Sequence, residues 1–129
     1  MHILTKLIRT YIMKTFNEAT NELLDFISSD YANWYSRTEY CDSRDEANER
    51  GQEFREQLEI REGRKYLKVV RVDNQQSVWG FVVKEDDKKF KKGDILLAAG
   101  FNAPARNKAR GNIFDDALNV RWSGPGYLF

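Results

Sequence analysis

The chain changes its hydrophobic pattern once, close to Gly63, and this change constrains the fold more than any other feature. Before it, apolar residues recur at intervals of mostly three and four, as on one face of an amphipathic helix. After it, short runs rich in β-branched and aromatic residues alternate with glycines, as in strands joined by tight turns. A helical part followed by a strand-rich part predicts an α+β fold.

Two helices are expected in the first part. The first carries its apolar residues on one face, and residues 28–30 either interrupt it or cap a second segment. These apolar residues are Phe16, Ala19, Leu23, Phe26, Ile27, Ala32, Trp34 and Tyr35. The second helix is expected to start at Ser43, because Ser43 and Glu46 have the spacing of a capping box. We expect it to continue through Ile60, although Gly51 in its middle weakens it.

Five short strands are expected in the second part. They cover residues 65–73, 77–85, 94–100, 112–114 and 119–122. Short strands separated by glycine-containing turns are typical of a strongly bent antiparallel sheet or a small SH3-like barrel. We therefore predict N-terminal helices packed on such a sheet or barrel, with an acidic helical region at 1–62 and a basic β region at 63–129 in one compact domain.

Size and composition limit the class of protein. A chain of 129 residues is close to the usual size of one domain and needs no metal or disulfide for its core. Cys41 is the only cysteine, which rules out an internal disulfide and fits a reducing cytoplasm. The apolar N-terminal stretch is interrupted by Lys6 and Arg9, whereas a bilayer span needs about 18 apolar residues. We expect a cytoplasmic protein with no membrane partner and no cofactor.

The first twelve residues allow two interpretations. Met13 opens a segment that resembles an ordinary start of translation, so the preceding residues are either a wrongly assigned extension or a genuine part of the chain. The second interpretation is supported by an apolar stripe at helical spacing. The stripe consists of Ile3, Leu4, Leu7, Ile8, Tyr11 and Ile12. The sequence leaves both interpretations open.

Charge is distributed unevenly along the chain. Residues 1–63 contain 8 Lys and Arg against 13 Asp and Glu, whereas residues 64–129 contain 13 against 7. Such a division favours either a basic half that binds a partner or two halves that attract each other on folding.

The most basic segment without a neighbouring acid is 102–112. It is a long connection without periodicity, and such loops often carry function. Its cations Arg106, Lys108 and Arg110, together with Arg121 and Trp122 further along the chain, are the predicted nucleic-acid-binding or partner-binding residues. Cations neutralise phosphates and exposed aromatic rings stack on bases, which small barrels often combine. The alternative is an ordinary basic loop, docked on the acidic helical half.

A second predicted surface lies in the helical half. Tyr31, Trp34 and Tyr35 provide more aromatic area than one helix needs for its core, and such residues are frequent at protein interfaces. We predict that this acidic, aromatic surface contacts a host or phage protein. The alternatives are that the rings pack on the sheet, or that the helical face mediates self-association.

Signals for catalysis are weak. His2, the only histidine, lies at the terminus, so a triad that depends on histidine is not expected. Neither a phosphate-binding glycine motif nor a metal motif is present, and the Asp86-Asp87 and Asp115-Asp116 pairs suit solvated turns. A small metal-dependent hydrolase that uses Asp115 and Asp116 remains an alternative to a non-enzymatic protein.

Three motifs resemble small, uncharacterised accessory proteins of tailed bacteriophages. The pattern is an F-x-K-G-D-I-L strand entry, an A-P-A-(K/R)-N-x-(A/P)-R-G-N loop and a closing (V/R)-x-W-(S/T)-G-P. Here they correspond to residues 90–96, with one extra lysine before Gly93, to 103–112 and to 120–125. The resemblance covers about residues 65–128 and implies a phage accessory protein in the cytoplasm of an infected bacterium. We therefore expect a non-enzymatic binding module, with a protein partner favoured over nucleic acid.

Overall fold

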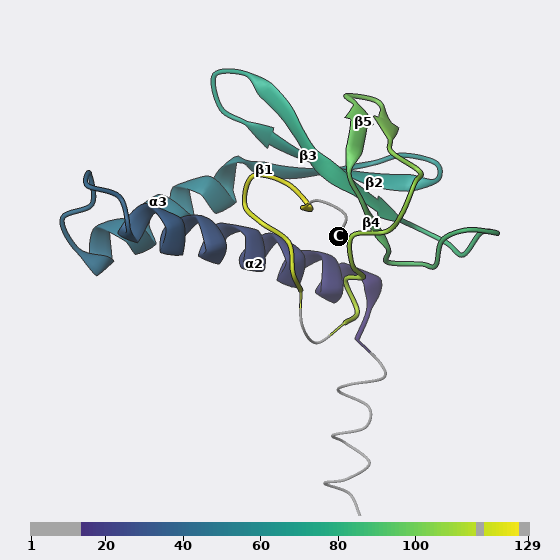
Figure 1. Cartoon of the computed structure of the whole chain (residues 1–129), viewed down its shortest axis with the longest axis horizontal. Helices are drawn as coiled ribbons and strands as arrows, with labels where there is room; N and C mark the ends of the chain where they lie inside the picture. Colours follow the sequence, from purple (N-terminus) through teal and green to yellow (C-terminus); the bar gives the residue numbers. More distant parts are fainter. Residues whose placement is uncertain (1–13, 116–117, 127–129) are drawn as a thin grey trace, which may run out of the picture.

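The computed structural model describes residues 14–115 and 118–126 and has an α+β architecture, as predicted (Figure 1). Within these residues two helices come first, α2 (Phe16–Ser36) and α3 (Arg44–Gln57). Six strands follow: β1 (Leu58–Glu62), β2 (Tyr66–Val72), β3 (Gln76–Val83), β4 (Ile95–Leu96), β5 (Ala98–Gly100) and β6 (Ala103–Pro104). The question of whether the chain starts at Met1 or Met13 lies outside the described residues.

The strands form two antiparallel sheets. The larger has the order β1-β2-β3-β4, and β5 pairs with β6 as a separate hairpin. The register of β2 against β3 shifts between Val69 and Val70, a bulge that increases the local twist. In the part of the chain that the structure describes, no ladder joins β4 back to β1, so the larger sheet is open and the predicted barrel closure is not confirmed.

Three of the five predicted strands differ from the observed ones. Residues 94–100 split at Leu97 into β4 and β5, which belong to different sheets. The expected strands at 112–114 and 119–122 contribute only isolated bridges, Asp94 with Asn112 and Arg121 with Gly124. Short runs at the end of a chain can bury their apolar residues as irregular segments, and a hydrophobic pattern alone does not separate that case from a strand.

Helix α2 is continuous through residues 28–30. Thr15 caps its start by accepting a hydrogen bond from the amide of Glu18 at 3.0 Å. Ser28 lies within the helix, where its hydroxyl donates to the carbonyl of Asp25 at 2.9 Å. The predicted interruption or second cap at residues 28–30 is therefore not observed.

Helix α3 begins where the capping pattern predicted but ends earlier than expected. The Ser43 hydroxyl accepts from the amide of Glu46 at 3.1 Å, which confirms Ser43 as the N-cap. The helix stops at Gln57, and residues 58–62 form β1 instead of the predicted last helical turn. Leu58 and Ile60 pack against the core while Glu59 points to solvent, which is the two-residue period of a strand.

The two helices approach each other closely at Gly51. A Cβ atom at this position would lie 2.8 Å from the Ala32 Cβ and 3.1 Å from the Ser28 carbonyl oxygen. Only a residue without a side chain fits at this distance. Gly51 lowers the helix propensity of α3, but it also permits the close contact of α3 with α2.

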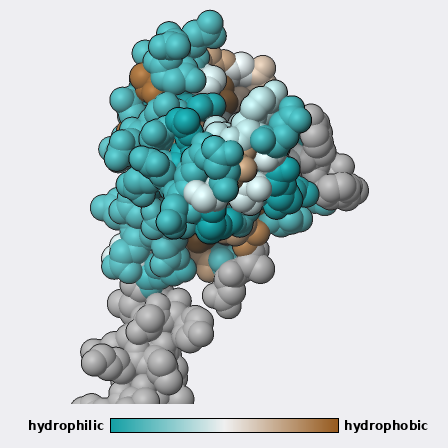
Figure 2. Space-filling view, turned by 90° about the vertical axis from the view of Figure 1, so that its left-hand side faces the viewer, coloured by the Kyte–Doolittle hydropathy of each residue, from teal (hydrophilic) through white to brown (hydrophobic). Residues whose placement is uncertain are grey.

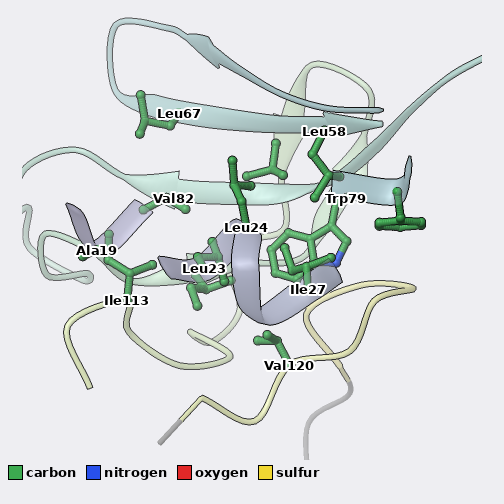
Figure 3. Packing of buried hydrophobic residues seen from close by; sticks show 13 residues of the cluster. Ala19, Leu23, Leu24, Ile27, Leu58, Leu67, Trp79, Val82, Ile113 and Val120 are labelled. Atoms are coloured by element: carbon green, nitrogen blue, oxygen red, sulfur yellow. The ribbon is translucent and has the colours of Figure 1, made fainter. Parts of the chain in front are cut away.

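The core lies between α2 and one face of the larger sheet (Figure 3). Leu23, Leu24 and Ile27 of α2 lie among Val82 and Trp79 of the sheet. Val120 and Ile113, from segments far along the chain, complete the same cluster. A second, smaller cluster of Phe81, Val83, Phe90 and Leu96 forms apart from it. Helices and sheet therefore share the larger of the two clusters.

Candidate functional site

The predicted basic segment 102–112 is held along β4. The amide of Ala105 donates to the carbonyl of Leu97 at 2.7 Å, and that of Arg110 donates to Ile95 at 2.7 Å. Ile95 in turn donates to Gly111 at 2.9 Å. These hydrogen bonds dock the segment on the sheet, whereas the alternative interpretation expected docking on the acidic helical half. Backbone hydrogen bonds fix the positions from which its cations project.

Arg106 has an acidic partner, which contradicts the expectation that no carboxylate is near the three cations. Its guanidinium lies 2.9 Å from an Asp87 carboxylate oxygen and also donates to the Tyr66 hydroxyl. It lies over the Phe90 ring at 4.9 Å from the centroid. The sequence reasoning missed this pair because the nearest acid in space is distant in sequence. Arg106 therefore serves as a structural contact.

Asp87 organises the turn that meets Arg106. Its side chain accepts from the backbone amides of Phe90 at 2.7 Å and Lys89 at 2.8 Å. The Phe90 amide first, and then the Arg106 guanidinium, lower the pKa of Asp87 to about 2. Neighbouring Asp86 accepts from the amide of Lys92 at 2.7 Å. Both carboxylates thus stabilise backbone turns, as expected of turn acids.

The other three predicted cations, Lys108, Arg110 and Arg121, line one cleft of about 660 Å³. Leu97 and Ala98 form part of its wall, and the turn at residues 123–126 forms another part. No carboxylate belongs to the described residues that line it. Lys108 and Arg121 are exposed, whereas Arg110 is partly buried and donates to the carbonyl of Gly126. The cleft therefore presents positive charge that no lining acid compensates.

The turn that carries Arg121 is attached to the sheet. The Trp79 indole nitrogen donates to the carbonyl of Arg121 at 2.8 Å. Pro125 packs on β3 so closely that a Cβ atom on Gly80 would lie 2.8 Å from its Cγ. Because the backbone of this turn is fixed in this way, the part of the cleft wall that the turn forms is in place before any ligand binds.

Trp122 points away from the cleft, although the sequence grouped it with these cations. Its ring lies 4.8 Å from that of Trp34 and 5.1 Å from that of Tyr31, measured between centroids. Its amide donates to the Asp30 carboxylate at 2.9 Å. Tyr31 also stacks on Phe54 at 4.4 Å. Trp122 thus joins the aromatic residues of the helices. Of the three residues predicted at a protein interface, Tyr31 packs against the core, through Phe54 of α3 and Trp122, where the alternative expected packing on the sheet.

Two of the aromatic residues predicted at a protein interface keep some exposure or a polar contact. Trp34 is 40% exposed. The Tyr35 hydroxyl donates to Glu46 at 3.1 Å, and partial burial raises the pKa of Tyr35. Figure 2, which faces the loop between α2 and α3, shows a mostly hydrophilic surface with scattered hydrophobic residues. A partner that binds there would meet mainly polar groups.

The described residues provide no metal site at the acid pair 115–116. Asp115 is exposed, and Asp116 lies outside the described residues. Across residues 14–115 and 118–126, no three side chains among His, Cys, Asp and Glu gather as ligands for a metal ion. Nor does any helix in these ranges combine the length and apolar composition needed to cross a bilayer.

Sequence reasoning missed a second group of cations at the turn between β1 and β2. Arg61, Arg64, Lys65 and Lys68 line a hollow of about 320 Å³ together with Tyr66 and Asn102. Their spacing in the sequence gives a weak signal, because acids at 59 and 62 lie among them. Only the fold brings this turn close to the tip of the β5–β6 hairpin.

A family model described as a family of unknown function, DUF7717, matches residues 2–128. The chain belongs to this family. The match to DUF7717 includes both helices, the sheets and the cleft, as well as the residues before Met13. The search of curated proteins and the search of solved structures found no match. Membership in DUF7717 thus supplies no activity, and the function must be argued from the site.

Proposed function

We propose that this DUF7717 protein is a non-enzymatic module that binds nucleic acid through the cleft of Lys108, Arg110 and Arg121. The observation that carries the proposal is the convergence of three cations on one cleft with no acid among its described lining residues. Phosphate groups are the common anionic ligands that take several cations at once, and releasing their counterions favours binding.

The position of the cleft supports the same proposal. Its cations come from two segments, 108–110 and the turn at 121, which are both held to the sheet by hydrogen bonds. A small, bent sheet with a basic edge is the arrangement by which small barrels contact a nucleic-acid backbone. The likeness to such barrels is part of the proposal.

The cellular setting is proposed from the sequence motifs alone. From their resemblance to accessory proteins of tailed phages we propose that the module acts in the cytoplasm of an infected bacterium, where host and phage nucleic acids are both accessible. Two of the three motifs contribute residues to the cleft: the second contains Lys108 and Arg110, and the third contains Arg121. The residues that carry the resemblance therefore include all three cations of the proposed site.

A protein partner is the second candidate, and it rests on Trp34. This ring is 40% exposed at the edge of the aromatic cluster, and Tyr40 nearby in the sequence is 73% exposed. The candidate is weaker than nucleic acid, because Tyr31 and Trp122 are used in internal packing and the surrounding surface is hydrophilic. Capture of a host protein from nuclease-treated lysate, and its loss with Trp34→Ala, would support it.

The test of the nucleic-acid proposal is binding of a labelled oligonucleotide, followed by fluorescence anisotropy over a range of KCl concentrations. The variant Lys108→Ala/Arg121→Ala removes two exposed cations and leaves Arg110 with its carbonyl partner. Each lost phosphate contact reduces the slope of log K against log salt by about 0.7 on single strands and about 0.9 on duplex. We expect the double variant to reduce the slope by about 1.4 or about 1.8, respectively.

The matched control is Lys88→Ala/Lys91→Ala, which removes the same charge from the exposed loop before β4. Its salt slope should stay close to that of the unchanged protein, since these lysines do not line the cleft. If both double variants had the same affinity and the same slope of log K against log salt, net charge alone would determine binding, and this result would overturn the proposal. Absence of binding by the unchanged protein would do the same.

A further inference from the structure

The hollow at the turn between β1 and β2 carries positive charge that is only partly compensated. Arg61 pairs with Glu59 at 3.2 Å, and Glu62, the acid that lines the hollow, pairs with Lys84 at 3.5 Å. Arg64, Lys65 and Lys68 take part in no ion pair within the described residues. Three cations thus remain for an external anion.

An exposed aromatic ring lies beside these cations. Phe101, at the tip of the β5–β6 hairpin, is 40% exposed. The Lys68 ammonium lies 4.2 Å from the centroid of its ring and donates to the side chain of Asn102 at 2.7 Å. A phenylalanine at a hairpin tip leaves apolar surface in water without contributing to the core. The contact with the Lys68 ammonium helps to hold the Phe101 ring in place. Such a ring is available to stack on a flat ligand.

The β5–β6 hairpin connects this hollow to the cleft. Ala98, at its base, lines the cleft, and Phe101 follows three residues later at its tip. At about 3.3 Å per residue, the tip lies about 10 Å from the base. A second connection runs through Arg106, which is two residues before Lys108 and donates to the hydroxyl of Tyr66, a residue that lines the hollow. The hairpin and Arg106 therefore link the two basic sites.

We propose that the ligand of the cleft is single-stranded nucleic acid, which crosses the β5–β6 hairpin and stacks a base on Phe101 while Arg64, Lys65 and Lys68 contact its phosphates. This inference rests on the proposed function of the cleft. The choice of a single strand follows from Phe101, because a duplex keeps the faces of its bases stacked on one another, whereas an unpaired base offers a face to an aromatic ring.

The test compares a single-stranded oligonucleotide with a duplex of the same length, at the same salt concentration, for the unchanged protein and for Phe101→Leu. Leucine keeps an apolar side chain and removes the aromatic face. Base stacking contributes about 1–3 kcal/mol per base, so the single-strand affinity should fall between about 5-fold and about 140-fold, and duplex affinity should stay unchanged. Phe101→Trp should retain the affinity, because it restores an aromatic face.

Phe26→Leu is the matched control, since Phe26 is similarly exposed, at 36%, but lies on α2 away from both basic sites. Equal affinity for single strand and duplex, or an unchanged single-strand affinity for Phe101→Leu, would overturn the inference. The proposed function fails separately, when Lys108→Ala/Arg121→Ala leaves binding and its salt slope unchanged. If single strands bind through the cleft but Phe101→Leu has no effect, the cleft proposal stands and the stacking proposal falls.

Discussion

Gly51→Ala tests the close contact between α2 and α3, and two opposing effects decide its sign. In a solvated helix, replacing glycine by alanine stabilises by about 0.8–1 kcal/mol. Here the new Cβ would lie 2.8 Å from the Ala32 Cβ, whereas carbon atoms in good contact are about 3.5–4.0 Å apart. The same Cβ would also lie 3.1 Å from the Ser28 carbonyl oxygen, so it cannot move away from Ala32 in that direction. Neither neighbour is the end of a flexible side chain, so the helices themselves must separate.

The magnitude follows from these two terms. Forcing an extra methyl group into a packed contact typically costs about 1–3 kcal/mol. After subtraction of the gain in helix propensity, the free energy of unfolding is expected to fall by about 1 kcal/mol, where an uncrowded site would show a rise of similar size. In urea denaturation followed by circular dichroism, with an m-value of about 1–3 kcal/mol/M, the midpoint should fall by roughly 0.3–1 M.

Ala32→Gly combined with Gly51→Ala provides the matched control. The double variant moves one methyl group from α2 to α3, so the two propensity terms cancel and the shortest contact disappears. It should be clearly more stable than the sum of the two single variants implies, because the residues are in direct contact. Additive effects, or a Gly51→Ala protein that is more stable than the unchanged one by about 1 kcal/mol, would refute the close approach of the helices.

Two further changes test the contacts around the candidate site. Because the pKa of Asp87 is lowered to about 2, its carboxylate stabilises the fold above about pH 4 and loses this effect as the pH falls toward 2. Asp87→Asn should therefore melt at lower temperature than the unchanged protein at pH 7, with the difference shrinking in acid; a constant difference would contradict this. Asp30→Ala removes the acceptor of the Trp122 amide and should cost about 1.5–3 kcal/mol in urea denaturation, whereas Asp30→Asn keeps an oxygen acceptor and should cost less.

The local part of the fold was predictable from the sequence. Ser43 with Glu46 located the start of α3, and the gap between the predicted strands 65–73 and 77–85 located the turn between β2 and β3. Both signals depend on residues close together in the chain. The end of α3 was not predictable in the same way, because Leu58 and Ile60 suit a strand as well as a helix and pairing with β2 decides between them.

The candidate site was predictable only in part. The sequence identified Lys108 and Arg110 as candidates because no acid adjoins their segment, and Arg121 because it lies beside Trp122. It could not place the three around one cleft. It misplaced Arg106 and Trp122, whose partners Asp87 and Asp30 are 19 and 92 residues away along the chain. The topology of the fold decides which residues pair over such separations. The residues adjacent in the sequence do not reveal that topology.

The dependence of the core on Val120 and of α2 on Trp122 also sets an order for folding during synthesis. Until Val120 and Trp122 have left the ribosome, α2 lacks part of its cover and keeps apolar side chains in water. Contacts between such distant positions form slowly, and nascent chains with exposed apolar surface are prone to associate. Stalled or prematurely terminated chains of this protein should therefore be targets for chaperones and proteases.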